Sequence, residues 1–300
     1  MRRRFFLMYN SGAGAARGES VARLERALIA GGGSVLRGTA ATVETARAEA
    51  AAAAQSGDFD AIIAAGGDGT VRQAAIAALG TSCCVGAMMI GTGNVLAHEL
   101  GLPRHPEAIA AMLRDGPAIP LELGRANGAP FLLMAGAGLD GRIIKRLHQP
   151  LKRWTGKAAF GPAGLAALAE PLDRISVEID GLTHQCAWAI VTNAAHYGSS
   201  FRLTSSVSLK TSGLAAVLFR ARNRRDLAAQ MAALAMGRVD DRAAWDTDWV
   251  SIHSCTHVRL WADPATAVQV DGDAFGTTPV DISNDGGRIS MIVPVDHETR

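Results

Sequence analysis

The stretch AIIAAGGDGT, residues 61–70, decides the fold, because an apolar run leads directly into a glycine-rich turn. The run Ala61–Ala65 has the length and composition of a buried strand, and Val71–Leu79 has a helical pattern. Strand, turn and helix in this order are typical of an α/β fold with a parallel sheet. Glycines in such a turn let backbone N–H groups approach a phosphate, and the start of the helix adds a favourable dipole.

Asp68 lies in the middle of this turn, and the stretch alone leaves two interpretations of it open. Asp-Gly pairs are common in ordinary β-turns, where the carboxylate caps the helix that follows. A carboxylate among phosphates would instead hold Mg²⁺ or orient a nucleophile. The first interpretation is structural and the second is functional.

The elements before this stretch repeat the same alternation. The predicted strands are Phe5–Tyr9 and Ser34–Leu36, and the predicted helices are Val21–Ala30 and Val43–Gln55. Alternating strands and helices predict an α/β N-terminal domain with a doubly wound parallel sheet.

After Pro120 the pattern changes to short strands separated by turns, with few helices. We predict a second, antiparallel β-sandwich-like domain, with domains at 1–120 and 121–300. The extreme C-terminus is a candidate to return to the first domain. The predicted strands are Phe131–Met134, Ile175–Ile179, Ala187–Thr192, Ala215–Phe219, Val258–Trp261, Val268–Val270 and Ile289–Val293, and the predicted helices are Asp226–Met236 and the region around 163–169.

Two further glycine-rich segments follow predicted strands of the first domain. One is Asn10-Ser11-Gly12-Ala13-Gly14, and the other is Gly91-Thr92-Gly93-Asn94. Neither matches the GxxxxGK[ST] phosphate loop or the GxGxxG dinucleotide fingerprint. With the turn at 66–70 they make three loops after strands of one parallel sheet, and that edge is where α/β folds bind nucleotides.

Bulk composition excludes several classes. A formal net charge of +2 does not favour nucleic-acid binding. The four cysteines lack a CxxC spacing, so they predict reduced thiols. No apolar run reaches the roughly 18 residues of a transmembrane helix, and Phe5–Met8 is too short for a signal peptide. These features predict a cytoplasmic protein, with peripheral attachment at the inner membrane face left open and the oligomeric state undetermined.

In combination the motifs resemble the diacylglycerol kinase catalytic family, which includes sphingosine kinases and bacterial lipid kinases. The family pattern has NPxSGxG after the first strand, then GGDGT, then PxGTxNxxAxxLGIP. The matching segments, in the same order, are residues 10–14, 66–70 and 91–103, followed by AGAGLD (135–140), TNAAHYG (192–198) and Asp271-Gly272-Asp273, which is similar to the late DGE.

The resemblance implies an ATP-dependent lipid kinase with a diacylglycerol-like acceptor at a membrane surface, and an active site in a cleft between the two domains. It implies that Asp273 is the general base. In such a kinase we expect Asp68 to be catalytic by ordering the metal or the nucleophile, and Asp68 is the candidate Mg²⁺ ligand. Implied ATP contacts are Asn10, Ser11, Gly12, Ala13, Gly14, Gly66, Gly67, Asp68, Gly69, Thr70, Val71, Arg72, Gln73, Thr92, Asn94 and a threonine after the second strand, Thr39 or Thr42, of which Thr39 is preferred.

The chain departs from the family pattern at several positions. Ser11 and Met89 replace prolines, and Arg72-Gln73 replaces Asn-Glu. Ser212 replaces an aspartate that holds a structural Mg²⁺ in relatives, so we expect no such ion around Leu209–Leu214 unless Asp140 or another nearby carboxylate compensates.

Two alternatives stay open on the sequence. NAD kinases also carry a GGDGT loop, but the segment at 91–103 and the late Asp-Gly-Asp fit lipid kinases better. The departures at Met89, Arg72 and Ser212 would also suit a catalytically weak regulator that binds lipid or nucleotide.

Overall fold

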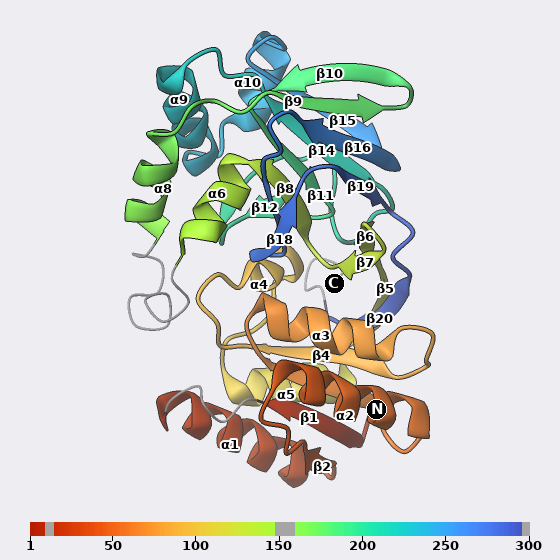
Figure 1. The fold of residues 1–300 in the computed structure, drawn as a ribbon. Helices are drawn as coiled ribbons and strands as arrows, with labels where there is room; N and C mark the ends of the chain where they lie inside the picture. Colours follow the sequence, from red (N-terminus) through yellow and green to blue (C-terminus); the bar gives the residue numbers. More distant parts are fainter. Residues whose placement is uncertain (10–14, 148–159, 296–300) are drawn as a thin grey trace. The chain divides into compact units, whose positions relative to one another are not determined.

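The computed structural model describes residues 1–9, 15–147 and 160–295 (Figure 1). The chain divides into two compact units. We call Met1–Leu121 with Gly287–Arg300 the α/β unit, and Glu122–Gly286 the sandwich unit. In the described part of the chain, no helix combines the length and the apolar character needed to cross a bilayer.

The α/β unit is built on a six-stranded, mostly parallel sheet. In spatial order its strands are β2 (Ser34–Arg37), β1 (Arg4–Tyr9), β3 (Ala61–Gly66), β4 (Cys84–Met89), β20 (Arg288–Ile292) and β5 (Ala118–Glu122). Strand β3 is apolar throughout and nearly all of it is buried, so it lies in the middle of the sheet. The far end of the chain returns here, because β20 pairs in parallel with β4 through Met291 and Val85.

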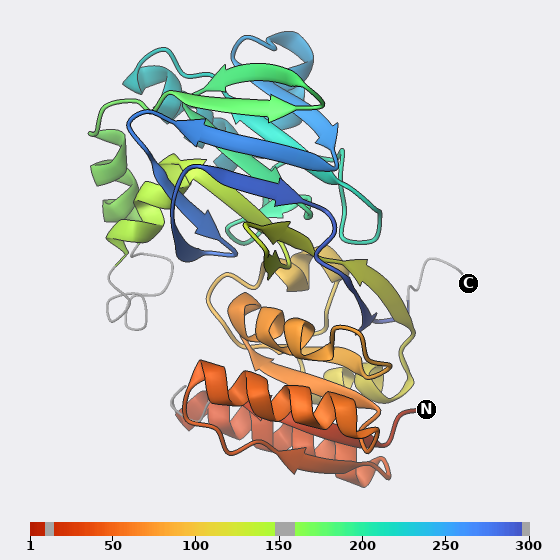
Figure 2. The same ribbon diagram turned by 45° about the vertical axis from the view of Figure 1, so that its right-hand side comes forward.

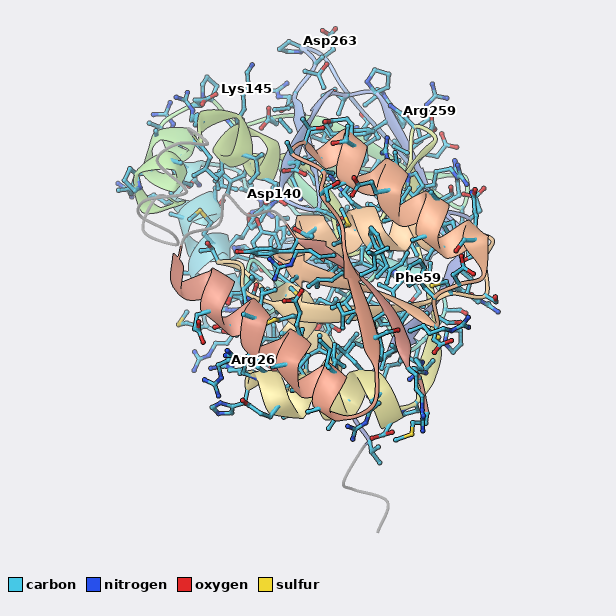
Figure 3. All side chains as sticks on the ribbon, turned by 90° about the horizontal axis from the view of Figure 1, so that it is seen from below. Arg26, Phe59, Asp140, Lys145, Arg259 and Asp263 are labelled. Atoms are coloured by element: carbon cyan, nitrogen blue, oxygen red, sulfur yellow. The ribbon has the colours of Figure 1, made fainter. Side chains whose placement is uncertain are left out.

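Helices cover both faces of this sheet, as a doubly wound fold requires (Figure 3). Helix α1 (Ala15–Ala30) packs against α5 (Pro106–Asp115), and α2 (Val43–Ser56) packs against α3 (Asp68–Ala78). A short helix, α4 (Val95–Leu100), follows β4. The predicted α/β fold of this half is therefore confirmed.

The sandwich unit contains two antiparallel sheets (Figure 2). Buried side chains from strands of both sheets form one core. One sheet has the order β10 (Leu182–Cys186), β9 (Ile175–Ile179), β16 (His257–Ala262), β19 (Val280–Ser283), β6 (Gly124–Ala126) and β7 (Ala129–Phe131). The other has the order β15 (Val250–Cys255), β14 (Leu214–Phe219), β11 (Trp188–Thr192), β8 (Met134–Gly138), β17 (Ala267–Val270) and β18 (Asp273–Thr277).

The remaining elements of this unit are α6 (Leu139–Arg146), α8 (Phe160–Leu168), α9 (Arg224–Ala235), α10 (Val239–Trp245) and the small pair β12 (His196–Tyr197) and β13 (Phe201–Arg202). The predicted strand Phe131–Met134 is wrong, because β7 ends at Phe131 and β8 begins at Met134. Between them the backbone N–H groups of Leu132 and Leu133 bond the side chain of Asp271 instead of a neighbouring strand.

Candidate nucleotide and catalytic site

Two glycine-rich loops of the α/β unit meet where β3 and β4 end. The N–H of Ile90 donates to the carbonyl of Gly66 at 2.9 Å. A Cβ added at Gly91 would lie only 2.5 Å from the Cα of Gly67, which is closer than real Cβ contacts. Glycine is therefore required for the two loops to touch, and their backbone groups line one surface at the carboxyl edge of the sheet.

Asp68 joins these two loops. It is the first residue of α3, and its carboxylate accepts the N–H groups of Val95 at 3.1 Å and Leu96 at 3.0 Å. Asn94, just before α4, has a left-handed backbone (φ 53°) and makes no side-chain cap of its own. Burial raises the pKa of Asp68, and the N–H groups that it accepts oppose that rise. The interpretation that Asp68 caps the helix directly after it is wrong, because the N-cap of α3 is Gly67 and has no side-chain cap. Asp68 instead caps α4, the helix after the second loop.

The predicted nucleotide contacts do not all present their side chains in the same way. Val71 is fully buried, so only its backbone could face a ligand. Gln73 is also buried, and its Oε1 accepts from Arg47 Nη1 of α2 at 3.4 Å. Gly66 ends β3, and Gly69, Thr70 and Arg72 lie near the start of α3. Gly67, Thr92 and Asn94 lie in the two loops, whereas residues 10–14 lie outside the described residues.

The threonines after β2 both bond within the protein. The hydroxyl and the N–H of Thr39 donate to the carboxylate of Glu49 on α2, at 2.9 and 3.0 Å. Thr42 is the N-cap of α2 and forms a capping box with Thr45. Both hydroxyls are therefore engaged within the α/β unit, that of Thr39 with Glu49 and that of Thr42 with its own helix.

The carboxylate of Asp68 suits a magnesium ion whose other ligands come mainly from a nucleotide. Oδ2 of Asp68 accepts the N–H of Val95 and Oδ1 accepts the N–H of Leu96. A carboxylate offers about four lone-pair sites, so the same group can also bind a cation or the water that a cation holds. Mg²⁺ commonly uses one or two carboxylates together with substrate phosphates and water. No group of three acidic, histidine or cysteine side chains suited to a metal occurs among the described residues, so an all-protein cage is absent there.

Asp271 and Asp273 flank the turn between β17 and β18 in the sandwich unit and have different surroundings. Asp271 has a left-handed backbone (φ 50°), and its carboxylate accepts the N–H groups of Leu132, Leu133 and Met134 at 2.8–3.0 Å. Asp273 begins β18, is exposed and pairs in register with Val270. Asp271 therefore anchors the turn, and Asp273 is the carboxylate presented to solvent.

The loop that carries Ser212 is held by hydrogen bonds of its own. The Ser208 carbonyl accepts both the N–H and the hydroxyl of Thr211, and Ser208 Oγ accepts the N–H of Lys210. Ser212 Oγ donates to Glu122 Oε1 at 3.0 Å. The nearby carboxylate from another strand is thus Glu122, which sequence reasoning missed because no motif marks it.

Asp140, the other carboxylate considered for that loop, lies elsewhere in the unit. Asp140 lies at the start of α6 (Figure 3) and is only 1% exposed. Its carboxylate accepts hydrogen bonds from Tyr197 and Gln269. Gln269 was also missed. The signal for it was a polar residue inside the apolar strand β17, whose four residues are all buried.

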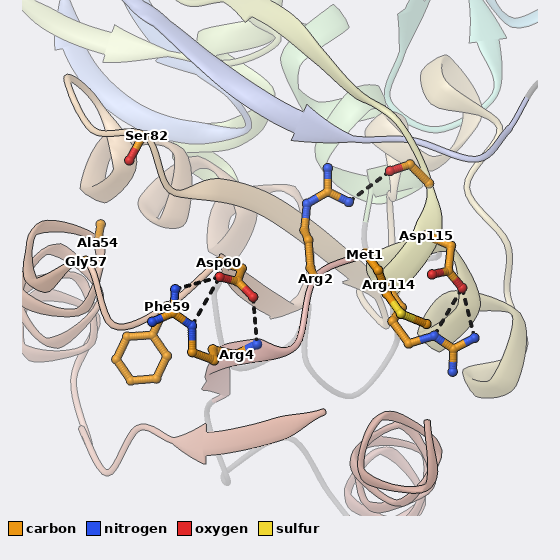
Figure 4. Close-up of a pocket in the computed structure, with 11 residues that line it drawn as sticks. Met1, Arg2, Arg4, Ala54, Gly57, Phe59, Asp60, Ser82, Arg114 and Asp115 are labelled. Carbon is orange, nitrogen blue, oxygen red and sulfur yellow. Dashed lines mark hydrogen bonds and ion pairs between the residues drawn. The ribbon is translucent and has the colours of Figure 1, made fainter. Parts of the chain in front are cut away.

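A cavity of about 450 Å³ lies at the opposite, amino-terminal end of the parallel strands (Figure 4). Its charged groups are engaged with one another: Arg4 pairs with Asp60 at 2.8 Å, and Arg114 pairs with Asp115 at 2.9 Å. Arg2 Nη1 donates to the Gly116 carbonyl at 2.9 Å. These arginines support the ends of β1 and α5, and the cavity is separate from the two glycine-rich loops.

Comparison with known proteins gives matches along most of the chain. Residues 4–126 match the diacylglycerol kinase catalytic domain, and residues 134–293 match the YegS C-terminal, NAD kinase β-sandwich-like domain. The chain is similar to a probable YegS-like lipid kinase of Pseudomonas putida, 36% identical over 132 residues, or 43% of this chain and 44% of the relative. It is also similar to a diacylglycerol kinase of Bacillus subtilis, 34% identical over 133 residues, with the same coverage.

The curated relatives are matched over only about half of their length, 55% in one Synechocystis protein and 44% in the two relatives above. A crystal structure of a putative diacylglycerol kinase from Bacillus anthracis superposes with a TM-score of 0.74, over 97% of this chain and 95% of the other. Its 17% identity supports the fold alone. The two domain matches, in this order, show that the chain belongs to the diacylglycerol kinase catalytic-domain family and carries a YegS-type C-terminal domain.

Proposed function

We propose that the protein is an ATP-dependent lipid kinase that transfers the γ-phosphoryl group to a lipid hydroxyl, with a diacylglycerol-like lipid as acceptor. One observation carries this proposal. The Asp68 carboxylate holds two glycine-rich loops together at the start of a helix, at the carboxyl edge of a parallel sheet. A surface of backbone N–H groups beside a carboxylate suits a magnesium-bound polyphosphate.

The nucleotide is proposed to bind along these loops. The phosphates would face backbone N–H groups of Gly67 and Gly69 at the start of α3, where the helix dipole favours negative charge. Thr92 and Asn94 are proposed as polar contacts from the second loop, with Thr39 and residues 10–14 completing the set. Mg²⁺ held by Asp68 and the phosphates would neutralise charge that develops on the transferring group.

Asp273 is proposed as the general base. An alcohol has a pKa far above neutral, so a positioned carboxylate must accept its proton as the oxygen attacks. The lipid oxygen forms a bond to the γ-phosphorus, and the bond from that phosphorus to the β,γ-bridging oxygen breaks. ADP leaves, and the proton passes to the Asp273 carboxylate.

The lipid acceptor follows from the family and from the names of relatives, which are a probable lipid kinase and a diacylglycerol kinase. A lipid with two acyl chains is presented at a membrane surface, so the enzyme would work there as a peripheral protein on the cytoplasmic side. No nucleic-acid partner is proposed.

The test is transfer of labelled phosphate from [γ-³²P]ATP in the presence of Mg²⁺ to mixed vesicles that contain diacylglycerol. The expected result is a labelled phospholipid that wild type produces and that Asp68→Asn and Asp273→Asn do not. Parallel reactions contain ceramide, a sphingoid base or NAD as acceptor. Label in NADP alone would replace the proposal with an NAD kinase, and ATP binding without any transfer would indicate a binding protein.

A further inference from the structure

A buried carboxylate of the sandwich unit lies next to the turn that carries Asp273. Asp140, in the first turn of α6, accepts the Tyr197 hydroxyl on Oδ1 at 2.7 Å and Gln269 Nε2 on Oδ2 at 3.2 Å. Tyr197 in turn packs edge-on against Trp188, with ring centroids 6.4 Å apart. A buried carboxylate without a function would be costly compared with an apolar residue of similar size.

Gln269 connects this carboxylate to the turn between β17 and β18. Gln269 is only 3% exposed, and its Oε1 accepts the N–H of Gly272 at 2.8 Å. Gly272 has a left-handed backbone (φ 81°), as has Asp271 before it. The next residue is Asp273, so Gln269 bonds the backbone immediately before the proposed base.

The donors and acceptors allow only one orientation of the Gln269 amide. An ionised Asp140 only accepts hydrogen bonds, so it requires the NH₂ group of Gln269. The N–H of Gly272 only donates, so it requires the oxygen. Each end of the amide therefore has one suitable partner, and the side chain of Gln269 is held from both sides. A flipped amide would place its NH₂ group against the N–H of Gly272 and its oxygen against the carboxylate of Asp140.

A second anchor holds the other side of the same turn. The carboxylate of Asp271 accepts three backbone N–H groups between β7 and β8. The turn is therefore fixed by Asp271 on one side and by Gln269 on the other. A catalytic carboxylate has to be held within about 0.5 Å of its working position, and this requires the backbone that carries it to be fixed.

We infer that Tyr197, Asp140 and Gln269 form a positioning relay that fixes the backbone at Gly272 and so aims the Asp273 carboxylate. The inference rests on the proposed function of Asp273. None of the three relay residues is proposed to touch the substrate. Their effect is on the placement of the base, so it concerns the rate of the chemical step and leaves ATP binding to the loops of the other unit.

The experiment compares three variants of the full chain in the phosphate-transfer assay. Gln269→Leu removes both hydrogen bonds of the amide, and Tyr197→Phe removes one hydroxyl while keeping the ring. Gln230→Leu is the matched control, because Gln230 is a fully buried glutamine that donates to a backbone carbonyl, that of Trp249, at 2.8 Å. We expect kcat to fall roughly 10- to 100-fold in Gln269→Leu, and less in Tyr197→Phe, with the KM for ATP unchanged and the control near wild type.

A second readout does not depend on activity. The amide proton of Gly272, followed by NMR hydrogen exchange, should exchange faster in Gln269→Leu and Tyr197→Phe than in wild type or in Gln230→Leu. A normal kcat in Gln269→Leu, with transfer still dependent on Asp273, overturns the relay and leaves the proposed function standing. A wild type that transfers no phosphate to any lipid removes the proposed function, and the catalytic role of the relay with it.

Discussion

The carboxylate of Asp68, the first residue of α3, accepts the N–H of Leu96 in α4 at 3.0 Å. This bond crosses from one glycine-rich loop to the next, and a second bond to Val95 accompanies it at 3.1 Å. The proposed catalytic carboxylate is therefore also a structural one. Substitutions at Asp68 have to be judged on stability and on activity separately.

Asp68→Ala is expected to abolish phosphate transfer and also to lower the free energy of unfolding by about 1–3 kcal/mol, because two buried N–H groups lose their acceptor. Denaturant unfolding and the transfer assay measure the two effects. Asp68→Asn keeps a carbonyl oxygen for one of these N–H groups but removes the charge, so it should recover part of the stability and no activity. Normal transfer by Asp68→Asn would leave Asp68 with the capping role alone.

Asp273→Asn is expected to lower kcat by roughly 10²–10⁴ while the affinity for ATP stays the same, because the amide cannot accept the proton. Initial rates with a lipid acceptor and equilibrium binding of ATP test the two statements. Asp273→Glu, which restores the residue common in the family, should stay active. Near-normal turnover of the Asn variant would contradict the assignment of the base.

The buried Asp140 predicts a pH dependence of stability. Burial raises its pKa from the ordinary 3.8 to about 6. The folded protein therefore binds the proton of the Asp140 carboxyl more tightly than the unfolded chain does. The resulting contribution of Asp140 to the free energy of unfolding is fully present below about pH 4 and is lost as the pH rises through about 6. The loss amounts to about 3 kcal/mol, since one pKa unit corresponds to about 1.4 kcal/mol.

The measurement is the difference in unfolding free energy between wild type and Asp140→Asn at pH 4, 5, 6 and 7. Asn does not titrate, so the unfolding free energy of the variant should rise relative to that of wild type as the pH increases. The difference should become constant above pH 6–7. Effects of the other carboxylates cancel in the difference. A constant difference from pH 4 to 7 would mean that Asp140 titrates normally in the folded protein.

The pair Ser212 and Glu122 predicts how weakly the loop that carries Ser212 binds Mg²⁺. The neutral Ser212 donates to Glu122 at 3.0 Å, and a single carboxylate is a weak Mg²⁺ site. We expect millimolar Mg²⁺ without nucleotide to leave the melting temperature of wild type unchanged. In Ser212→Asp two carboxylates would repel each other, so this variant should melt lower without Mg²⁺ and be stabilised when Mg²⁺ is added.

Ser212→Asn is the neutral control for that experiment and should not respond to Mg²⁺. A Mg²⁺-dependent rise in the melting temperature of wild type, abolished by Glu122→Gln, would show that Glu122 replaces the aspartate of relatives.

The contact between Gly67 and Gly91 predicts what a methyl group added at Gly91 would do to stability and to ATP binding. Gly91→Ala would place a Cβ 2.5 Å from the Cα of Gly67, so the two loops must separate. The expected result is a loss of about 1–3 kcal/mol in stability together with weaker ATP binding. Gly69→Ala is the control for stability, because its Cβ meets nothing within 4 Å and alanine favours a helix. Equal melting temperatures for Gly91→Ala and wild type would contradict the close packing.

The α/β half was predictable because its signals are local. The run 61–65 is apolar for the whole length of β3, and glycines follow it directly, so strand, turn and helix are each encoded by adjacent residues. The late return of the chain was predictable only in part. The sequence around 289–293 indicates a strand. That this strand pairs with β4 is not encoded locally, because it depends on β4 having an unpaired edge in the folded sheet.

The amino-acid sequence by itself determined the alternation of elements, the three glycine-rich loops and the carboxylates at 68 and 273, since residue type and short spacing specify these. Tertiary structure decided what each carboxylate bonds. Asp68 caps a helix 27 residues further on, and Asp271 holds backbone N–H groups 137 to 139 residues earlier. Glu122 meets Ser212, and Gln269 connects Asp140 to the turn before Asp273. Hydrogen bonds need a specific geometry between two groups, and when those groups are far apart in the chain only the folded backbone brings them within hydrogen-bonding distance.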